Sequence, residues 1–331
     1  MSSGEEPTPD VGRDDASGWG QDPPPNRLRP LNLGDVLDGA FRLLRDHWRA
    51  FAIGLGVVVV PLALLSGLVT TLMFGTQPGF FEMVQDPAAV QNWAQGRPPE
   101  NLGAFAAAGG LAALASLLLT PLLYGTSVHI AATAYRGQRV DPMASLRAAG
   151  RRYFALLGAS ILLFLIPLLI FLAPLLLVII GGVTGVDGLS LIGGLGLIVS
   201  GVFALIAVVR ILLTFPTLMI ERVGPVQALQ RSNILVKGKT GVVLGTVVVV
   251  YLITVIIGLV LAFPFQAIGG AVGEAAGAVA VTVGQMVSSL VTDALMGAAL
   301  VLVYFDRRVR TEGYDLTELA SELGAPNDPS R

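Results

Sequence analysis

The chain has 331 residues, of which 53% are hydrophobic and 13% are charged, and its formal net charge is -2. Because soluble domains average about 25% charged residues, this composition excludes an ordinary soluble domain and predicts a surface that faces lipid. The sequence contains no cysteine, which excludes disulfides, iron–sulfur clusters, thiolate zinc sites and cysteine nucleophiles. His47 and His129 are its only histidines, which are few ligands for a histidine-based metal site.

Residues 1–28 are rich in Pro, Gly, Asp and Ser and contain few large aliphatic side chains. Such a segment buries too little apolar surface to offset its conformational entropy, so we expect a disordered tail. No short apolar core follows a basic start before Ala50. The sequence therefore predicts no secretory signal, and the first apolar stretch is expected to direct its own insertion.

Six apolar stretches follow, each with at least the roughly 20 residues that a helix needs to cross a bilayer. They cover residues 50–74, 104–134, 153–180, 191–220, 242–265 and 276–305. Several exceed the required length, which predicts tilt or an extension beyond the bilayer. The predicted fold class is all-α, a polytopic membrane protein with six transmembrane helices.

Basic residues gather in alternate gaps between these stretches. They are Arg42, Arg45, Arg49, Arg136, Arg139, Arg147, Arg151, Arg152, Arg222, Arg231, Lys237, Lys239, Arg307, Arg308 and Arg310. The opposite gaps, 75–103, 181–190 and 266–275, contain a single basic residue, Arg97. By the positive-inside rule, both termini are expected in the cytoplasm. The preference for arginine over lysine, with an Ala, Gly and Val bias, suits a GC-rich bacterial genome, so we expect a bacterial cytoplasmic membrane.

Three short segments, each just before an outward-going stretch, have the spacing of amphipathic helices on the cytosolic face. They cover residues 31–48, 140–152 and 223–236. The pattern predicts a unit of interfacial helix, outward span, loop and inward span, used three times. These helices either only seat the bundle on the headgroups or also bind a partner or anionic lipid. The candidate headgroup contacts are Arg147, Arg151, Arg152, Arg231 and Lys237.

Two ionisable residues, Arg210 and Asp293, interrupt the fourth and sixth apolar stretches. An unpaired charge in hydrocarbon costs about 2.5 kcal/mol or more, so each is expected to find a partner. Arg210 lies 11 residues before Glu221, and Asp293 lies 13 residues before Asp306. At a helical rise of about 1.5 Å per residue their depths differ by about 3 Å, so we predict an intramembrane polar pair.

Polar side chains follow helical spacing along three of the stretches, and these faces are expected to turn toward the bundle interior. The candidate lining residues are His129 on the second stretch, Thr214 and Thr217 on the fourth, and Gln285 and Ser289 on the sixth. Two interpretations remain open: hydroxyl groups that bond across packed helices, or an ion or substrate path. The third stretch has little that is polar beyond Ser160 and is expected to face lipid.

No complete catalytic or cofactor motif is present in the sequence. Gly238-Lys239-Thr240 resembles the end of a phosphate-binding loop, but Asn233 stands where that motif needs glycine, and no strand precedes it. A Gly-x-Ser-x-Gly elbow and a His-Glu-x-x-His pair are also missing. We therefore expect no enzymatic activity, no cofactor, no metal site and no nucleic-acid partner.

Three groups of short motifs resemble one family. They are Arg29-Pro30-Leu31 with Gly34-Asp35-Val36-Leu37-Asp38-Gly39-Ala40-Phe41; Glu221-Arg222-Val223-Gly224-Pro225 with Ala228-Leu229-Gln230-Arg231-Ser232 and Lys237-Gly238; and Tyr304-Phe305-Asp306 with Arg310 and Glu312-Gly313-Tyr314-Asp315. Over residues 29–316 the chain resembles the multi-span membrane domain associated with glycerophosphoryl diester phosphodiesterases, and more closely the stand-alone bacterial, often actinobacterial, proteins named after that domain. The resemblance implies a membrane domain between tails at 1–28 and 317–331, without the separate soluble barrel that carries hydrolysis in the full-length enzymes.

Two hypotheses about function follow, and both place the chain in a lipid bilayer. The first is a structural or regulatory module that binds anionic lipid or another membrane protein and has no catalytic domain. The second is a small-molecule or lipid transporter whose path uses Arg210 and Asp293. A dry contact between these two charges favours the first hypothesis, and their separation around a wet cavity favours ligand binding or transport.

Overall fold

The computed structural model describes residues 32–74, 102–272 and 274–312, and all regular secondary structure in these ranges is helical. The helices are α1 (Leu33–Asp46), α2 (Trp48–Phe74), α5 (Leu102–Tyr135), α6 (Pro142–Arg151), α7 (Tyr153–Thr184), α8 (Asp187–Ile211), α9 (Thr214–Ile220), α10 (Pro225–Val236), α11 (Thr240–Ala271) and α12 (Glu274–Glu312). Six segments are long and apolar enough to cross a membrane, so the chain is an all-α, polytopic membrane protein. The predicted tails at 1–28 and 317–331 lie outside the described residues.

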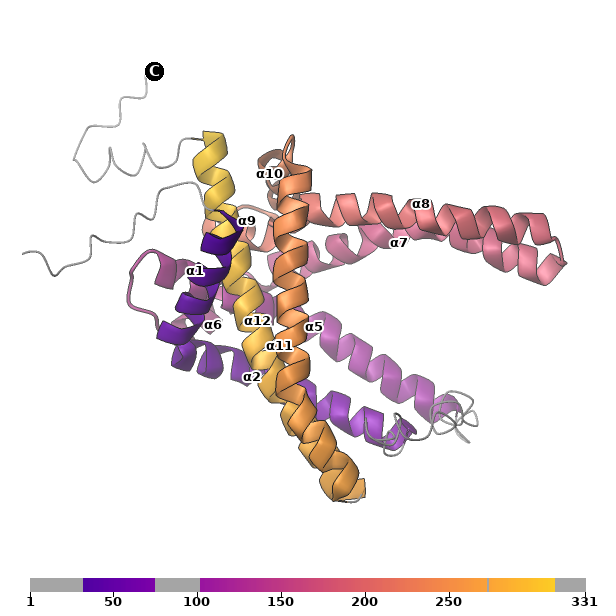
Figure 1. Ribbon diagram of the computed structural model, residues 1–331, viewed down its shortest axis with the longest axis horizontal. Helices are drawn as coiled ribbons and strands as arrows, with labels where there is room; N and C mark the ends of the chain where they lie inside the picture. Colours follow the sequence, from indigo (N-terminus) through magenta and orange to yellow (C-terminus); the bar gives the residue numbers. More distant parts are fainter. Residues whose placement is uncertain (1–31, 75–101, 273, 313–331) are drawn as a thin grey trace, which may run out of the picture.

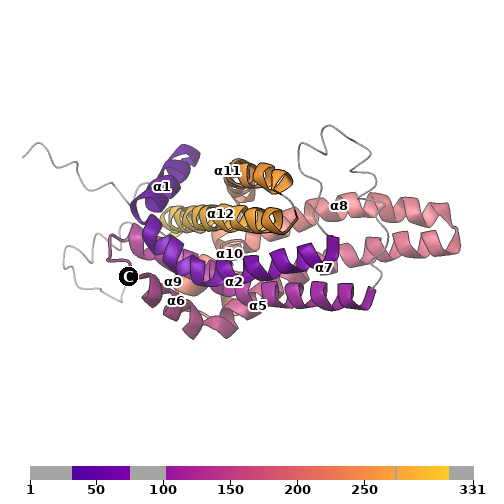
Figure 2. The ribbon, with the colours of Figure 1, turned by 90° about the horizontal axis from the view of Figure 1, so that it is seen from below.

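Three helical hairpins diverge from one region of the molecule (Figure 1). α2 packs against α5, α7 against α8 and α11 against α12, and the three pairs point in different directions. A second view shows the short helices α1, α6, α9 and α10 gathered away from the tips of the hairpins (Figure 2). We call the region formed by these short helices and the adjoining parts of the long helices the convergent end.

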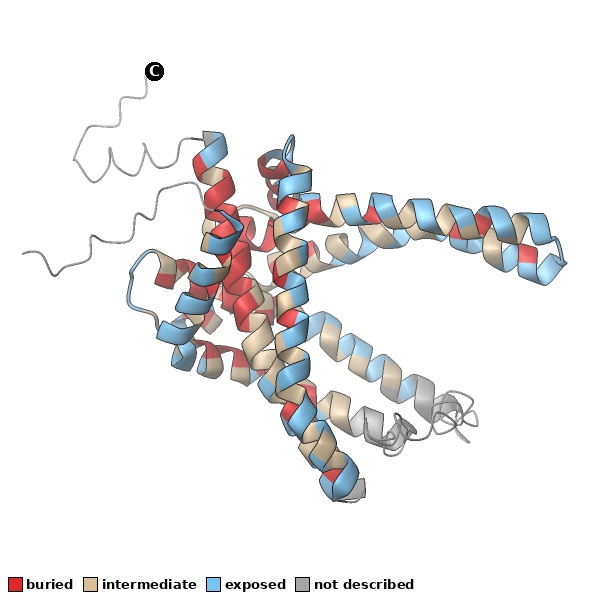
Figure 3. Cartoon of the chain, in the orientation of Figure 1, coloured by how far each residue is buried: buried red, intermediate tan, exposed pale blue. Residues whose placement is uncertain are grey.

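Burial is concentrated at the convergent end, and the hairpins become more exposed toward their tips (Figure 3). The largest fully buried side chains include Tyr304, Phe51, Leu55, Ile130, Leu156, Leu213, Leu218, Leu235 and Leu295. Large apolar side chains such as Leu191, Ile198 and Leu259 are exposed along the hairpins. In a bilayer these side chains contact lipid chains, so the hairpins need little protein around them. The convergent end contains polar groups that need hydrogen-bond partners within the protein, and burial is concentrated there.

The three predicted amphipathic helices are confirmed as α1, α6 and α10. Polar side chains satisfy amides at their first turns: Asp35 accepts from the Asn32 amide at 2.9 Å, and Asp141 accepts from the Met143 amide at 2.9 Å. Pro225 stands in the first turn of α10, where its missing amide costs nothing. A short helix followed by a hairpin therefore occurs three times, as α1 with α2/α5, α6 with α7/α8, and α10 with α11/α12.

The fourth predicted span, residues 191–220, is not one continuous helix. α8 ends at Ile211, and α9 begins at Thr214. Pro216 contributes to the break, because proline has no amide to donate to the carbonyl of Leu212 four residues earlier, and its ring crowds that carbonyl. Proline alone is not sufficient, since α7 stays continuous through Pro167 and Pro174. The convergent end therefore contains a separate short helix, α9, which follows the α7/α8 hairpin and precedes α10 in the chain.

Candidate functional site

The structure does not form the predicted pair between Arg210 and Asp293. Arg210 is exposed on α8 and lines a largely apolar cavity with Phe203 and Asn233, whereas Asp293 on α12 lines a different cavity with Tyr124. Among the described residues no ion pair joins the two charges. The prediction is wrong because α8 packs along α7, and its contacts with the rest of the molecule include α10 and α11, each of which also contacts α12.

Asp293 faces a groove of about 380 Å³ in the membrane-spanning part of the chain. We call it the Asp293 groove; its lining residues are Tyr124 of α5, Tyr251, Thr254, Val255, Gly258, Leu259, Ala262 and Gln266 of α11, and Gln285, Ser288, Thr292, Asp293 and Met296 of α12. Gln285 therefore lies where the sequence pattern placed it, beside Asp293. Ser289, the other candidate on this helix, is not one of the lining residues.

The remaining candidate lining residues satisfy groups within the protein instead of lining a cavity. The Nδ1 of His129 lies 3.1 Å from the Ser145 hydroxyl and so links α5 to α6. Thr214 and Thr217 are fully buried, and their hydroxyls donate to backbone carbonyls of Ile211 and Leu213. These bonds compensate the helix break near Pro216, so of the two interpretations a structural role suits these threonines better than an ion or substrate path.

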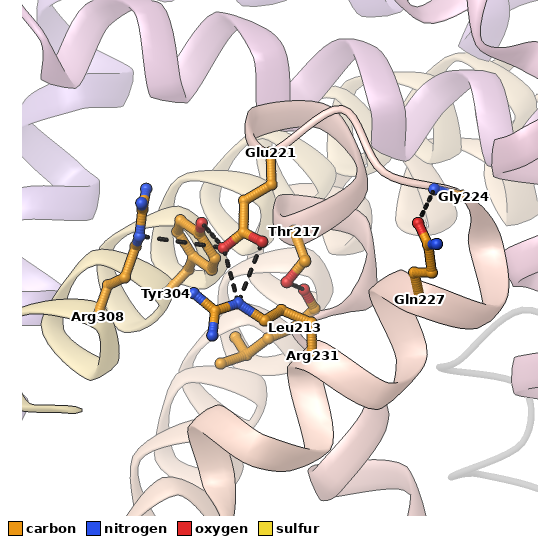
Figure 4. A network of polar contacts seen from close by, with 8 residues as sticks. All are labelled: Leu213, Thr217, Glu221, Gly224, Gln227, Arg231, Tyr304 and Arg308. Carbon is orange, nitrogen blue, oxygen red and sulfur yellow. Dashed lines mark hydrogen bonds and ion pairs between the residues drawn. The ribbon is translucent and has the colours of Figure 1, made fainter. Parts of the chain in front are cut away.

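Glu221, at the end of α9, joins three elements of the convergent end (Figure 4). Its carboxylate accepts from the Tyr304 hydroxyl of α12 at 2.7 Å and from the Arg231 Nε of α10 at 3.1 Å. The Arg308 Nε lies 4.0 Å from the same carboxylate. Charge-assisted bonds of this kind, in a largely buried setting, hold α9, α10 and α12 in one arrangement.

Arg152 has a comparable role at the start of α7. Its guanidinium donates to the backbone carbonyls of Leu218, Arg222 and Val223, with the Arg222 bond at 2.5 Å and the Val223 bond at 3.2 Å. These carbonyls belong to the end of α9 and the turn after it, where the helix itself supplies no partners. Arg222 adopts a positive φ of 57° in this turn.

The structure separates the five predicted headgroup contacts into two groups. Arg152 and Arg231 form hydrogen bonds within the protein, an arrangement that favours a structural role for these two side chains. Arg147 and Arg151 are exposed on α6, and Lys237 is exposed in the turn between α10 and α11. Sequence position could not separate these groups, because each of the five lies in a basic segment next to an apolar stretch.

A second cavity, which we call the basic cleft, has a volume of about 380 Å³ at the convergent end. Its lining residues are Asn32, Leu33 and Val36 at α1, Leu235, Lys237, Lys239, Val242, Val243 and Thr246 at α10 and α11, and Val303, Asp306, Arg307, Arg310 and Thr311 of α12. Four of these described residues are cationic and one is acidic. The cleft therefore contains members of each of the three motif groups noted in the sequence: Val36, Lys237, and Asp306 with Arg310.

Asp306 neutralises part of the charge in the basic cleft. Its carboxylate lies 2.9 Å from an Arg307 nitrogen and 2.8 Å from Arg310 Nε. Lys237 and Lys239 flank Gly238, which has a positive φ of 80°, and neither lysine forms an ion pair with a described residue. α11 begins directly after Lys239, so the partial positive charge of its N-terminus adds to the two ammonium groups.

The Lys237-Gly238-Lys239 turn is the part of this cleft that is visible in the sequence. It overlaps Gly238-Lys239-Thr240, which is too incomplete a motif to be a nucleotide-binding loop. What the sequence could not indicate is that Asn32 and Arg310, far away in the chain, lie beside this turn.

Within the described residues, no group of three or more His, Asp or Glu side chains lies close enough to hold a metal ion. No family model, curated protein or solved structure matches the chain. Functional proposals therefore depend on the geometry of the basic cleft and the Asp293 groove.

Proposed function

We propose that the chain is a multi-pass module of a bacterial cytoplasmic membrane that holds anionic lipid headgroups in the basic cleft and has no catalytic activity of its own. The alternation of basic and neutral gaps supports an orientation with both termini in the cytoplasm. In that orientation the convergent end lies at the cytoplasmic leaflet, where anionic lipids attract basic side chains.

The observation that carries this proposal is the presence in the basic cleft of two lysines that form no ion pair with a described residue. Lys237 and Lys239 line a cavity whose other cations, Arg307 and Arg310, form ion pairs with Asp306. Two guanidinium groups held by Asp306, two exposed ammonium groups and a helix N-terminus match a phosphate group better than a cation or a neutral ligand.

A lipid fits this cleft better than a free phosphate, because its walls are partly apolar. Leu33 and Val242 line the cleft and are exposed, with 38% and 61% of their surface accessible. These side chains give acyl chains an apolar surface while the headgroup lies among the cations. A transport path that needs both Arg210 and Asp293 has less support, since these residues line different cavities.

The test is the double variant Lys237→Gln/Lys239→Gln, purified as the full chain in nanodiscs of neutral lipid. Each basic residue near an anionic surface contributes about 1 kcal/mol, so the two changes should weaken binding of a short-chain phosphatidylglycerol by about 30-fold. Calorimetric titration measures this affinity, and inorganic phosphate serves as a second ligand that is expected to bind more weakly.

The matched control is Arg147→Gln/Arg151→Gln, which removes the same charge from an exposed helix outside the cleft. We expect this control to keep most of the affinity. Equal losses in the two double variants would mean that only general surface charge matters, and the basic cleft would no longer be a specific site.

A further inference from the structure

The Asp293 groove lies in the apolar part of the chain and has no part in the proposed lipid site. Its carboxylate makes no hydrogen bond or ion pair with another described residue, although the Asp293 backbone carbonyl accepts from the Ser127 hydroxyl at 3.0 Å. A carboxylate within a membrane span is costly unless it has a partner or a polar cavity. Among the described residues, this groove is the only polar cavity that adjoins the Asp293 carboxylate. A ligand that supplies a partner for the carboxylate would therefore be stabilised there.

The other polar groups of the groove fall into two sets. The hydroxyls of Ser288, Thr292 and Thr254 are used, because they donate to the carbonyls of Gly258, Ser288 and Val250. The remaining groups are the amides of Gln266 and Gln285 and the phenols of two tyrosines, Tyr124 and Tyr251, none of which bonds to another described residue. A ligand in this groove therefore meets one carboxylate, two side-chain amides and two aromatic rings.

This set of groups selects the chemical class of the ligand. No cationic side chain lines the groove, so an anion would be repelled by Asp293 without compensation. A divalent metal ion is also disfavoured, because calcium and magnesium need about six oxygen ligands and the groove offers one carboxylate. A carboxylate beside aromatic rings is instead the arrangement that recognises an alkylammonium group.

The groove also has an apolar rim that opens toward lipid. Val255 and Leu259 line it on α11, with 37% and 66% of their surface accessible. An alkyl chain can lie on these side chains while its charged end reaches Asp293. We propose that the Asp293 groove binds an amphiphilic organic cation, with Asp293 as the counter-ion and the rings of Tyr124 and Tyr251 against the ammonium group.

The experiment uses the full chain in nanodiscs of neutral lipid and three probes that share one alkyl chain: octyltrimethylammonium, octanol and octyl sulfate. Titration calorimetry, with empty nanodiscs as the blank, should show saturable binding of the ammonium probe alone. Asp293→Asn keeps the shape of the side chain and removes its charge, and it should lower this affinity by at least about tenfold. Asp293→Glu should restore most of the affinity.

Two further variants separate a binding role from a structural one. Tyr251 is exposed, so Tyr251→Leu should fold normally while lowering affinity for the ammonium probe by about threefold or more. Asp187→Asn removes a carboxylate at the start of α8, outside the groove, and should leave the affinity unchanged.

The proposal is overturned if Asp293→Asn binds the ammonium probe as well as the unaltered chain does. It is also overturned if octanol and octyl sulfate bind with the same affinity, because the groove would then be only an apolar surface. Should Asp293→Asn fail to fold, unchanged binding by Tyr251→Leu would reject the proposal on its own. Loss of binding in the lysine variants of the basic cleft would not bear on this groove, so the two proposals fail independently.

Discussion

Glu221 is the residue on which the arrangement of the convergent end most depends. It lies at the end of α9, accepts from Arg231 of α10 and from Tyr304 of α12, and so connects segments from the middle and the end of the chain. Its partners are all largely buried, and Tyr304 has no exposed surface. Removing one member of such a network leaves a buried polar group without its bond, which costs more than the bond itself contributes.

At this scale the variant Tyr304→Phe tests the network. It deletes only the hydroxyl that donates to Glu221, and we expect the free energy of unfolding to fall by about 2 kcal/mol, as for other bonds to a charged acceptor. Denaturant unfolding in mild detergent measures the change. The control is Tyr153→Phe at the start of α7, whose hydroxyl bonds to no described residue; an equal loss there would show that Glu221 is not the reason.

At the scale of elements, close packing within each hairpin depends on individual glycines. In the α7/α8 hairpin a Cβ at Gly193 would lie 2.7 Å from the Val178 nitrogen and 2.9 Å from the Pro174 carbonyl oxygen. Both are backbone atoms, so the neighbour cannot rotate away. The adjacent Gly194 faces open space, with nothing within 4 Å of an added Cβ.

This contrast predicts opposite outcomes for two neighbouring substitutions. Gly193→Ala should destabilise the chain by about 1 to 3 kcal/mol, because the helices must move apart. Gly194→Ala should be neutral or stabilising by up to about 1 kcal/mol, because alanine favours a helix. Thermal unfolding of the two variants in the same detergent compares them, and equal midpoints would contradict the packing of α7 on α8.

For the whole molecule, the three repeats place their short helices and their basic turns at one end. The two ends of the molecule therefore lie on opposite sides of the membrane, and their orientation can be tested by labelling. Because the chain contains no cysteine, a single introduced cysteine is the only thiol that reacts. Val186 lies in the turn between α7 and α8, and Arg139 lies between α5 and α6; both are exposed.

We expect Val186→Cys to react with an impermeant maleimide on intact cells, and Arg139→Cys to react only after the membrane is permeabilised. The unaltered chain provides a background without labelling, since it has no thiol. The reverse pattern would place the convergent end outside the cytoplasm and would remove the basis for binding cytoplasmic-leaflet lipids in the basic cleft.

The positions of the spans and of the short helices could be predicted from the sequence, because hydropathy and helical periodicity are local properties of the chain. The apolar run that begins at Tyr153 and the amphipathic segment that begins at Pro142 form helices for reasons that are visible in their own local sequence. Even the break in the fourth span has a local contribution from Pro216, although the length of that apolar stretch concealed it.

Which polar residues meet could not be predicted in the same way. Similar depth suggested that Arg210 and Asp293 would pair, but a pairing also depends on which helices are neighbours and how each is rotated. Those variables are decided by packing among segments far apart in sequence, and this packing separates the two charges. The same packing brings Glu221 to Tyr304 and places Arg310 near Lys237. Local sequence therefore determined the elements, and tertiary packing alone decided the sites, because contacts between helices depend on distant side chains.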